Sequence, residues 1–417
     1  MLNRRPYPLA FLLSESYALL SRMEQMKPFE LTMPMVKGAS VSTEALKLIG
    51  QLLLHGKTEL GRGINRFINL LRSRKAEEQS AENLQGEFTV LKLRYNQILD
   101  QLDIFADVLS QRSEHEVGIW LSGLDALAEN GLEVGRKYYE MPSLMVYLDR
   151  GHGAAIRRAR TRLPGGDENP IAVIQIPRER MVGNGIASSL IHEVGHQAAA
   201  LLDLVTSLRH DINMVKQDAG DAQDAWLCFD LWISEIIADF WAVAQLGVSA
   251  TLGLMSVVTL PDYFQFRMSM TDPHPVPYIR VQLSCRMGAR LFPDSQWDRL
   301  WKLWETFYPT NKLPQEKRII LQKLDDEMDR FIDLVLTHMP EALKGKQLID
   351  VFEIQQRQPQ ILRETFQQWK KTPALISQTE PLLVFAILGQ AKADHSITTK
   401  EESQLIKHQL NRWAMNR

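Results

Sequence analysis

Two histidines four positions apart, with a glutamate directly after the first, are the residues of this sequence best suited to chemistry. His192, Glu193 and His196 form the pattern H-E-x-x-H. On a helix of about 3.6 residues per turn, positions i and i+4 share a face, so both imidazoles can reach one zinc ion. The alternative is an ordinary helix whose two histidines make local hydrogen bonds. The prediction of a metal site therefore depends on a third ligand.

Two acidic residues further along the chain supply candidates for that ligand. A catalytic zinc ion takes three protein ligands and keeps its fourth position for water. Glu235 and Asp239 lie one helical turn apart in an apolar stretch, where unpaired acids are costly. We expect Glu235 to complete the ligand set and Asp239 to accept the second ring N–H of a ligating histidine. Cys228 lies two turns before Glu235, about 10 Å by helix rise, which excludes it from the same ion.

These motifs resemble those of known zinc peptidases. The H-E-x-x-H pattern followed by Glu235-x-x-x-Asp239 is similar to the gluzincins, the group of thermolysin, in which a glutamate on a later helix is the third ligand. The pattern H-P-x-x-x-x-R, from His274 to Arg280, resembles the motif that follows the third ligand in the CAAX prenyl protease family and its soluble bacterial relatives. The matching motifs cover residues 186–290. The resemblance implies a gluzincin-like catalytic core that hydrolyses peptide bonds.

A zinc site of this kind assigns a role to each nearby polar residue. Glu193 is the expected general base, which takes a proton from the zinc-activated water and passes it to the leaving amine. The oxyanion of the tetrahedral intermediate needs a further donor besides the metal. The candidates are polar residues that follow the acidic pair: His274, Tyr278, Arg280 and Tyr263. We favour His274 first, and the alternative for Arg280 is a structural salt bridge with Asp239 or another buried acid.

An extended substrate needs a binding strand near the metal. Residues 171–176 are rich in Val and Ile and lie between Pro170 and Pro177, which is typical of an edge strand. A peptide or protein substrate would add to this edge by main-chain hydrogen bonds. The intervening segment, with several arginines and glycines, favours a short basic helix followed by an open loop.

Composition limits the class of protein. The chain of 417 residues is 45% hydrophobic and 24% charged, as in a folded globular protein, and its net charge of -2 gives no general attraction to nucleic acid. Two cysteines provide no disulfide framework, and no secretion signal is evident, so we expect a cytoplasmic location. Residues 240–260 carry no charge but include polar residues and two glycines. This stretch indicates a buried helix with a turn between Gly247 and Gly253, and a membrane span is the less favoured interpretation.

The expected architecture is an α-rich α+β fold. It comprises a helical N-terminal region at residues 1–140, a zinc peptidase-like catalytic domain with a small sheet at residues 141–340, and a helical C-terminal region at residues 341–417. The motifs fall on two helices, at residues 186–205 and 221–246. The predicted activity is that of a zinc metallopeptidase. The alternatives are a non-peptide hydrolase or narrowly targeted processing enzyme, and an interaction or scaffold protein with a catalytically silent zinc site.

Overall fold

The chain has an α-rich α+β fold in a computed structural model that describes residues 6–149, 153–178, 183 and 185–417. The helices before the sheet are α1 (Tyr7–Glu24), α2 (Phe29–Thr32), α3 (Thr43–Arg72), α4 (Ala81–Ser110) and α5 (His115–Glu133). The strands are β1 (Leu144–Asp149), β2 (Ala155–Arg157) and β3 (Ala172–Pro177). The helices after the sheet are α6 (Gly185–Leu201), α7 (Leu204–Asp218), α8 (Gln223–Leu246), α9 (Val248–Val258), α10 (Asp262–Gln265), α11 (Pro277–Leu291), α12 (Gln296–Phe307), α13 (Gln315–Thr337), α14 (Pro359–Lys371), α15 (Pro381–Ala393) and α16 (Thr399–Met415).

Short 3₁₀ helices join several of these elements. They are η2 (Lys37–Ala39), η3 (Arg74–Ala76), η4 (Gln111–Ser113), η6 (Gly220–Ala222), η7 (Thr310–Lys312), η8 (Glu341–Leu343), η9 (Leu348–Val351), η10 (Ile354–Arg357) and η11 (Pro373–Gln378).

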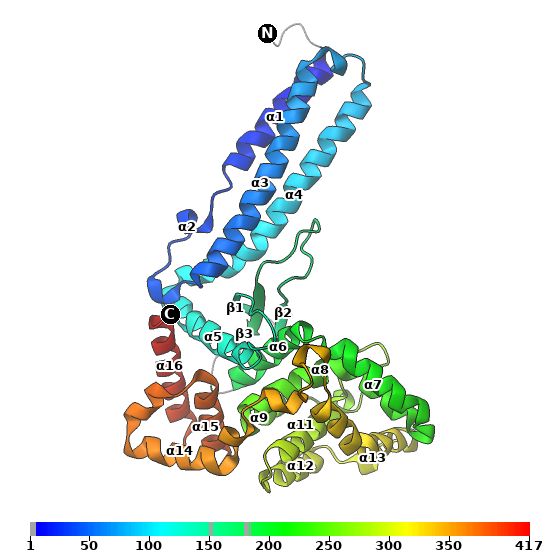
Figure 1. Ribbon diagram of the computed structural model, residues 1–417, viewed down its shortest axis with the longest axis vertical. Coiled ribbons are helices and arrows are strands. Elements are labelled where there is room, and N and C mark those ends of the chain that lie inside the picture. Colours follow the sequence, from blue (N-terminus) through cyan, green and yellow to red (C-terminus); the bar gives the residue numbers. More distant parts are fainter. Residues whose placement is uncertain (1–5, 150–152, 179–182, 184) are drawn as a thin grey trace.

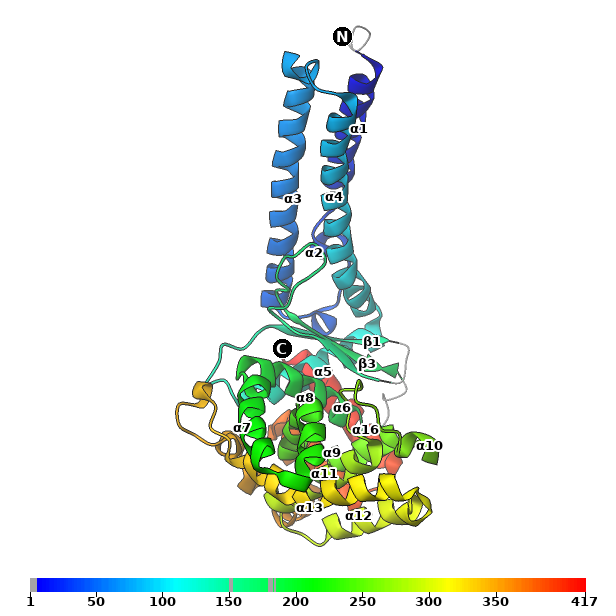
Figure 2. The same cartoon turned by 90° about the vertical axis from the view of Figure 1, so that its right-hand side faces the viewer.

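Three long helices, α1, α3 and α4, form a rod that projects from the rest of the molecule (Figure 1). Ser42 and Ser80 cap the starts of α3 and α4, because their side-chain oxygens accept hydrogen bonds from the N–H groups of Ala45 and Asn83. The apolar stripes of the three helices form a separate hydrophobic cluster inside the rod. The base of the rod lies next to the sheet, and α1 begins at the far tip (Figure 2).

The sheet has the strand order β1-β3-β2, with β1 parallel and β2 antiparallel to β3. The prediction that residues 171–176 form an edge strand was therefore wrong, because β3 pairs on both sides. The sheet edge nearest to His192 and His196 belongs instead to β2. This strand of three residues lies in the segment where the sequence favoured a short helix and a loop. So short a strand has too few residues to show an alternating pattern.

The two faces of the sheet contact different hydrophobic clusters. Val146, Ile174 and Ile156 pack with the large core of the body, formed by α5, α6, α8 and later helices. Met145 and Val173, which directly precede Val146 and Ile174, pack with the base of the rod. This alternation follows from the period of two in a β-strand. The sheet is thus a layer between the rod and the body.

The outer edge of β1 is covered by side chains. Gln111 donates to the carbonyl of Leu148 at 2.7 Å and accepts from its N–H at 2.9 Å. Arg112 donates to the carbonyl of Val146 at 2.6 Å, while Asp125 accepts from the Val146 N–H at 2.8 Å. These side chains take the place of a neighbouring strand and satisfy the backbone groups. Within the described ranges, the outer edge of β2 has no strand partner.

The helices predicted to carry the motifs correspond to α6 and α8, which lie against each other in the body. The first helix ends earlier than expected, because Asp203 adopts a left-handed conformation with φ of 49° before α7 begins. The predicted break at Gly247 is confirmed, since this residue has φ of 57° between α8 and α9. Gly253 is inside α9 and is not part of the turn. None of the helices in the described ranges is both long and apolar enough to cross a bilayer.

Candidate metal centre

The metal-binding motif depends on close packing between α6 and α8. Gly195 lies on the side of α6 that faces α8, and a Cβ atom at this position would be 2.9 Å from both the Cα of Ala238 and the Cβ of Trp241. Contacts this short leave no room for a side chain. The glycine inside the H-E-x-x-H motif therefore allows α8 to approach closely enough for its acidic residues to reach the histidines.

His192, His196 and Glu235 come together as the sequence predicts. One ligand atom from each lies within 4.8 Å of the other two, so the group could hold a metal ion. The Nε2 atom of His192 is 3.3 Å from Oε2 of Glu235, and the Nε2 atom of His196 is 3.3 Å from Oε1 of the same carboxylate. A tetrahedral ion with ligands at about 2.0–2.1 Å requires ligand atoms about 3.3 Å apart. Each imidazole nitrogen is thus at this spacing from a carboxylate oxygen, in each case a different oxygen of Glu235.

Asp239 and Arg280 fix the orientation of this group. Oδ1 of Asp239 is 2.8 Å from Nδ1 of His192, which leaves Nε2 facing Glu235. Arg280 donates to both oxygens of Asp239, from Nε at 2.6 Å and from Nη2 at 2.9 Å. The salt bridge between Arg280 and Asp239, the alternative considered from the sequence, is present. Oγ of Ser234 lies 3.4 Å from Nδ1 of His196, the corresponding position on the second ring.

The charges of these groups are strongly coupled. Burial disfavours a charged His192, but the charge and hydrogen bond of Asp239 prevail and raise its pKa to about 9. Burial likewise disfavours ionised Asp239, yet Arg280 and then His192 lower its pKa to about 2. For Glu235, burial is outweighed by hydrogen bonds from His192 and His196, so its pKa lies well below its ordinary value. Both carboxylates are therefore ionised at neutral pH.

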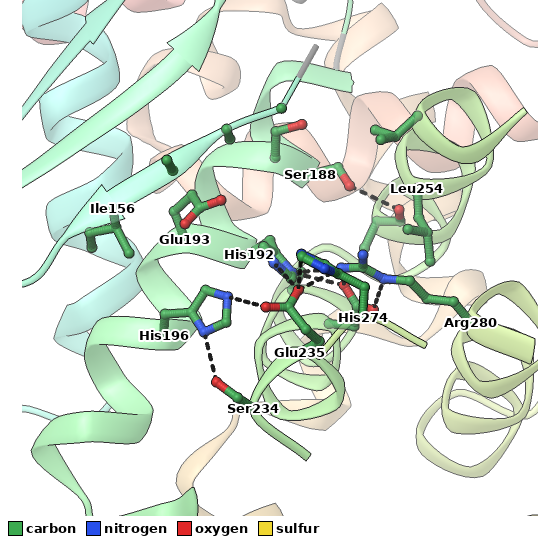
Figure 3. Close-up of a pocket in the computed structure, with 18 of the residues that line it drawn as sticks. Ile156, Ser188, His192, Glu193, His196, Ser234, Glu235, Leu254, His274 and Arg280 are labelled. Carbon is green, nitrogen blue, oxygen red and sulfur yellow. Dashed lines mark hydrogen bonds and ion pairs between the residues drawn. The ribbon is translucent and has the colours of Figure 1, made fainter. Parts of the chain in front are cut away.

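Glu193 occupies the same cavity but has a different environment. Its side chain is 6% exposed and lies on the sheet side of the histidines, near Ile156 (Figure 3). Its carboxylate makes no hydrogen bond with any residue that the structure describes. Burial raises its pKa above the ordinary value. Glu193 is thus a buried carboxylate beside the ligand group that is not used as a structural partner.

The centre opens into a cavity of about 510 Å³. Its walls come from β2, α6, α8, α9 and the start of α11, and the labelled residues in Figure 3 include Ile156 and Leu254 on its sides. A volume of this size is typical of a site that accepts part of a ligand from solution. The metal group is therefore accessible from the cavity.

Two of the four predicted oxyanion donors lie at this cavity. His274 lines it, with Nε2 3.7 Å from Oε2 of Glu235, and Arg280 lines it while it is bound to Asp239. Tyr278 is 6% exposed and packs against the rings of Phe266 and Trp301, away from the residues that line the cavity. The remaining candidate lies on α10 with 72% of its side chain exposed, also outside the lining: Tyr263.

The structure adds residues that the sequence analysis did not select. Asp272 orients His274, because its Oδ1 atom accepts from the backbone N–H at 3.0 Å and lies 2.8 Å from Nδ1 of the ring. The spacing D-x-H allows such a turn and was a usable signal. Ile156 and Leu254 could not be found in this way, because apolar residues at a cavity resemble apolar residues in a core.

Comparison with known proteins provides no independent assignment. No protein-family model matches the chain, and searches of curated proteins and of solved structures found no match. The likeness to the gluzincins rests on the motif residues and remains a prediction.

Proposed function

We propose that this protein is a zinc-dependent metallopeptidase. The observation that carries the proposal is the position of Glu193, a buried carboxylate without a structural partner among the described residues, next to three side chains whose ligand atoms lie within 4.8 Å of one another. A purely structural zinc site normally has four protein ligands. The described chain offers three within 4.8 Å and a cavity beside them, which favours catalysis.

Zinc suits the donor set of two imidazoles and one carboxylate. His192, His196 and Glu235 would hold the ion, with Asp239 supporting the first ring. When bound, zinc supplies a Lewis acid that polarises a carbonyl and lowers the pKa of water.

The protein's own residues then manage the protons. Glu193 accepts a proton from the attacking water, whose oxygen bonds to the carbonyl carbon of the substrate. The same carboxyl group delivers that proton to the amide nitrogen, the C–N bond breaks, and a carboxylic acid and an amine are formed. Burial of Glu193 keeps bulk water from competing for the proton.

His274 is the residue of this chain best placed to stabilise the oxyanion. Its Nδ1 atom is held by Asp272, so Nε2 points towards the cavity beside Glu235. Arg280 acts as a positioning residue, because it donates to both oxygens of Asp239 and its Nη2 atom also lies 3.4 Å from Oε2 of Glu235. Its function is to position Asp239 and, through it, His192.

The outer edge of β2 supports a peptide as the substrate. Ala155 and Ile156 line the metal cavity, and among the described residues the main chain of β2 pairs with β3 on one side only. An extended peptide can add to such an edge by main-chain hydrogen bonds, which do not depend on its side chains. Because Gln111, Arg112 and Asp125 cover the β1 edge, β2 is the edge of this sheet that a peptide can reach.

The direct test compares the wild-type chain with Glu193→Gln. Both proteins are loaded with one equivalent of zinc and incubated with quenched fluorescent peptide libraries and unfolded casein. We expect both to retain zinc and the wild type alone to hydrolyse peptide bonds, with a loss of at least about 10²-fold in the variant because a general base contributes this much. Glu341→Gln changes an exposed glutamate outside the cavity and is the matched control.

The outcomes separate the proposal from its main alternative. Stoichiometric zinc without hydrolysis of any substrate by the wild type would favour an interaction protein with a silent metal site. Equal hydrolysis by the wild type and Glu193→Gln would show that Glu193 is not the base.

A further inference from the structure

A second cavity lies on the opposite, rod-facing side of β2. It has a volume of about 780 Å³ and is walled by the last turns of α4, by β1 and β3, and by β2 itself. Three residues line both this cavity and the metal cavity: Ala155, Ile156 and Arg158. The edge segment therefore separates two cavities.

The register of β2 shows which side chains face each cavity. Ile156 pairs with Ile174, and both pack with the core of the body, on the side of the metal. Arg157 pairs with Val173, which packs with the base of the rod. Successive positions on the edge strand thus point alternately to the metal side and to the rod side.

We propose that an extended peptide bound along β2 is recognised on both faces of the sheet, with alternate side chains in the metal cavity and in the second cavity. This inference rests on the proposed peptide substrate. A strand added to a sheet has the same alternation as its neighbour, so its successive side chains must enter the two cavities in turn. The rod would then contribute to substrate selection through the end of α4.

The two cavities differ in chemistry. Beyond the metal group and Arg158, which lines both cavities, the metal cavity is lined mainly by serines and by small or apolar side chains such as Ala242, Val243 and Leu254. The second cavity contains mainly polar groups, which are Asp107, Gln111, Tyr147, Asp149, Arg157, Arg158, Thr161 and Gln175. The proposed substrate class is therefore an extended peptide in which apolar residues alternate with polar ones.

Asp107 is the group through which the rod can contact such a polar side chain. It is exposed on the last turn of α4, and its carboxylate has no hydrogen bond or ion pair with the residues that the structure describes. Tyr147 and Gln175 are already bonded to each other, from the hydroxyl to Oε1 at 3.0 Å. A hydrogen bond to an ionised carboxylate is stronger than one to a neutral group, so Asp107 should favour peptides with a hydrogen-bond donor at this position.

The experiment measures peptide binding apart from hydrolysis. Zinc-loaded full-length Glu193→Gln is titrated, by fluorescence anisotropy, with peptides in which Leu alternates with Lys or Gln, and with peptides of the same composition in which like residues occur in pairs. We expect alternating peptides to bind about tenfold more tightly, which corresponds to about one favourable charged hydrogen bond. Alternation is tested as a pattern, so the binding register need not be known.

Two further substitutions in the Glu193→Gln protein test whether the preference for alternating peptides depends on the second cavity. Asp107→Leu should remove most of the preference for alternating peptides, whereas Asp103→Leu should leave it unchanged, because Asp103 is equally exposed one turn earlier on α4 but does not line the cavity. Equal affinity for alternating and paired peptides, equal effects of the two substitutions, or no binding of any peptide would each overturn the inference.

The same proteins distinguish this inference from the proposed function. Hydrolysis by the wild type without a preference for alternation would leave the peptidase intact and overturn the role of the second cavity. Preferential binding of alternating peptides without hydrolysis by the wild type would support recognition along β2 and contradict the peptidase.

Discussion

The Nδ1 atom of His192 lies 2.8 Å from Oδ1 of Asp239, one helical turn beyond the carboxylate that faces Nε2 of the same ring. The histidine is therefore held between two acids of one helix. Because Asp239 occupies Nδ1, the ring can offer only Nε2 to an ion, and its plane is fixed before the ion arrives. Arg280 keeps Asp239 ionised and in place.

Replacing Asp239 should weaken metal binding without removing a ligand. We expect Asp239→Asn to lower zinc affinity by about 10–100-fold, because the ring loses its charged acceptor and Arg280 loses its counter-charge. Competition with a chromophoric chelator at fixed pH measures the change. Asp230→Asn, on the same helix but paired with Arg209 and Lys216, is the control and should bind zinc normally. Unchanged affinity in Asp239→Asn would contradict the positioning role.

Gly195 provides a test of the helix spacing. We expect Gly195→Ala to destabilise the fold by about 1–3 kcal/mol, because the added methyl group would meet the backbone of α8 and overpack the interface. If α8 moves away from α6 to make room for the methyl group, Glu235 should separate from the histidines and zinc affinity should fall. Chemical denaturation and the chelator assay measure the two effects.

The control for this substitution is Gly50→Ala on α3, where a Cβ atom meets nothing within 4 Å. There the change should be neutral or stabilising by up to about 1 kcal/mol, since alanine favours a helix. A Gly195→Ala protein as stable as Gly50→Ala, with full zinc affinity, would show that the interface has room to adjust.

The candidate metal ligands could be predicted from the sequence because helix periodicity places the members of each pair on one face. His192 and His196 share a face on any regular helix, and the same holds for Glu235 and Asp239. Burying Glu235 and Asp239 in an apolar stretch is costly unless they have partners, which indicated that this acidic pair meets the two histidines. That indication is consistent with the observed distances between the imidazole nitrogens and Glu235.

The residues that the sequence could not place depend on tertiary packing. Tyr278 follows His274 by four positions, yet it lies on the first turn of α11 and packs into the core, because the direction of a side chain at a helix start is set by the neighbouring helices. The order of strands in the sheet also has no local signal. β3 has the prolines of an edge strand at its ends, where they do not interrupt the ladder with β1 or β2.

The covered edge of β1 should depend on one buried ion pair. Arg112 and Asp125 are both fully buried, bond to each other at 2.9 Å and bond to the backbone of Val146. We expect Arg112→Ala to lower the free energy of unfolding by about 2–3 kcal/mol, because the Val146 carbonyl loses its donor and buried Asp125 keeps only Arg417 as a charged partner. Urea denaturation followed by circular dichroism measures the loss.

An exposed pair at the end of α5, the helix that carries Asp125, gives the comparison. Arg136 and Glu133 are 2.6 Å apart, but both are well exposed, so Arg136→Ala should cost no more than about 1 kcal/mol. Similar losses in the two variants would show that burial does not determine the contribution of Arg112.

Glu129 should make stability depend on pH. Burial raises its pKa from 4.5 to about 7, and the opposing charge of Arg417 only partly offsets this effect. Between these two values the folded protein holds a proton that the unfolded chain has lost, so the contribution of this residue to stability is largest at low pH and decreases as the pH rises from about 4.5 to about 7. Above that range the contribution is constant.

The measurement is the difference in unfolding free energy between the wild type and Glu129→Gln, determined from pH 4.5 to pH 8. Relative to the variant, the wild type should lose about 1–2 kcal/mol across this interval, a figure reduced for solvent screening because 34% of the side chain is exposed. Asn130→Ala is the control. Its side chain accepts a hydrogen bond from Leu382 but does not titrate, so its cost should be the same at every pH. A pH-independent difference for Glu129→Gln would mean that Arg417 fully compensates the buried carboxylate.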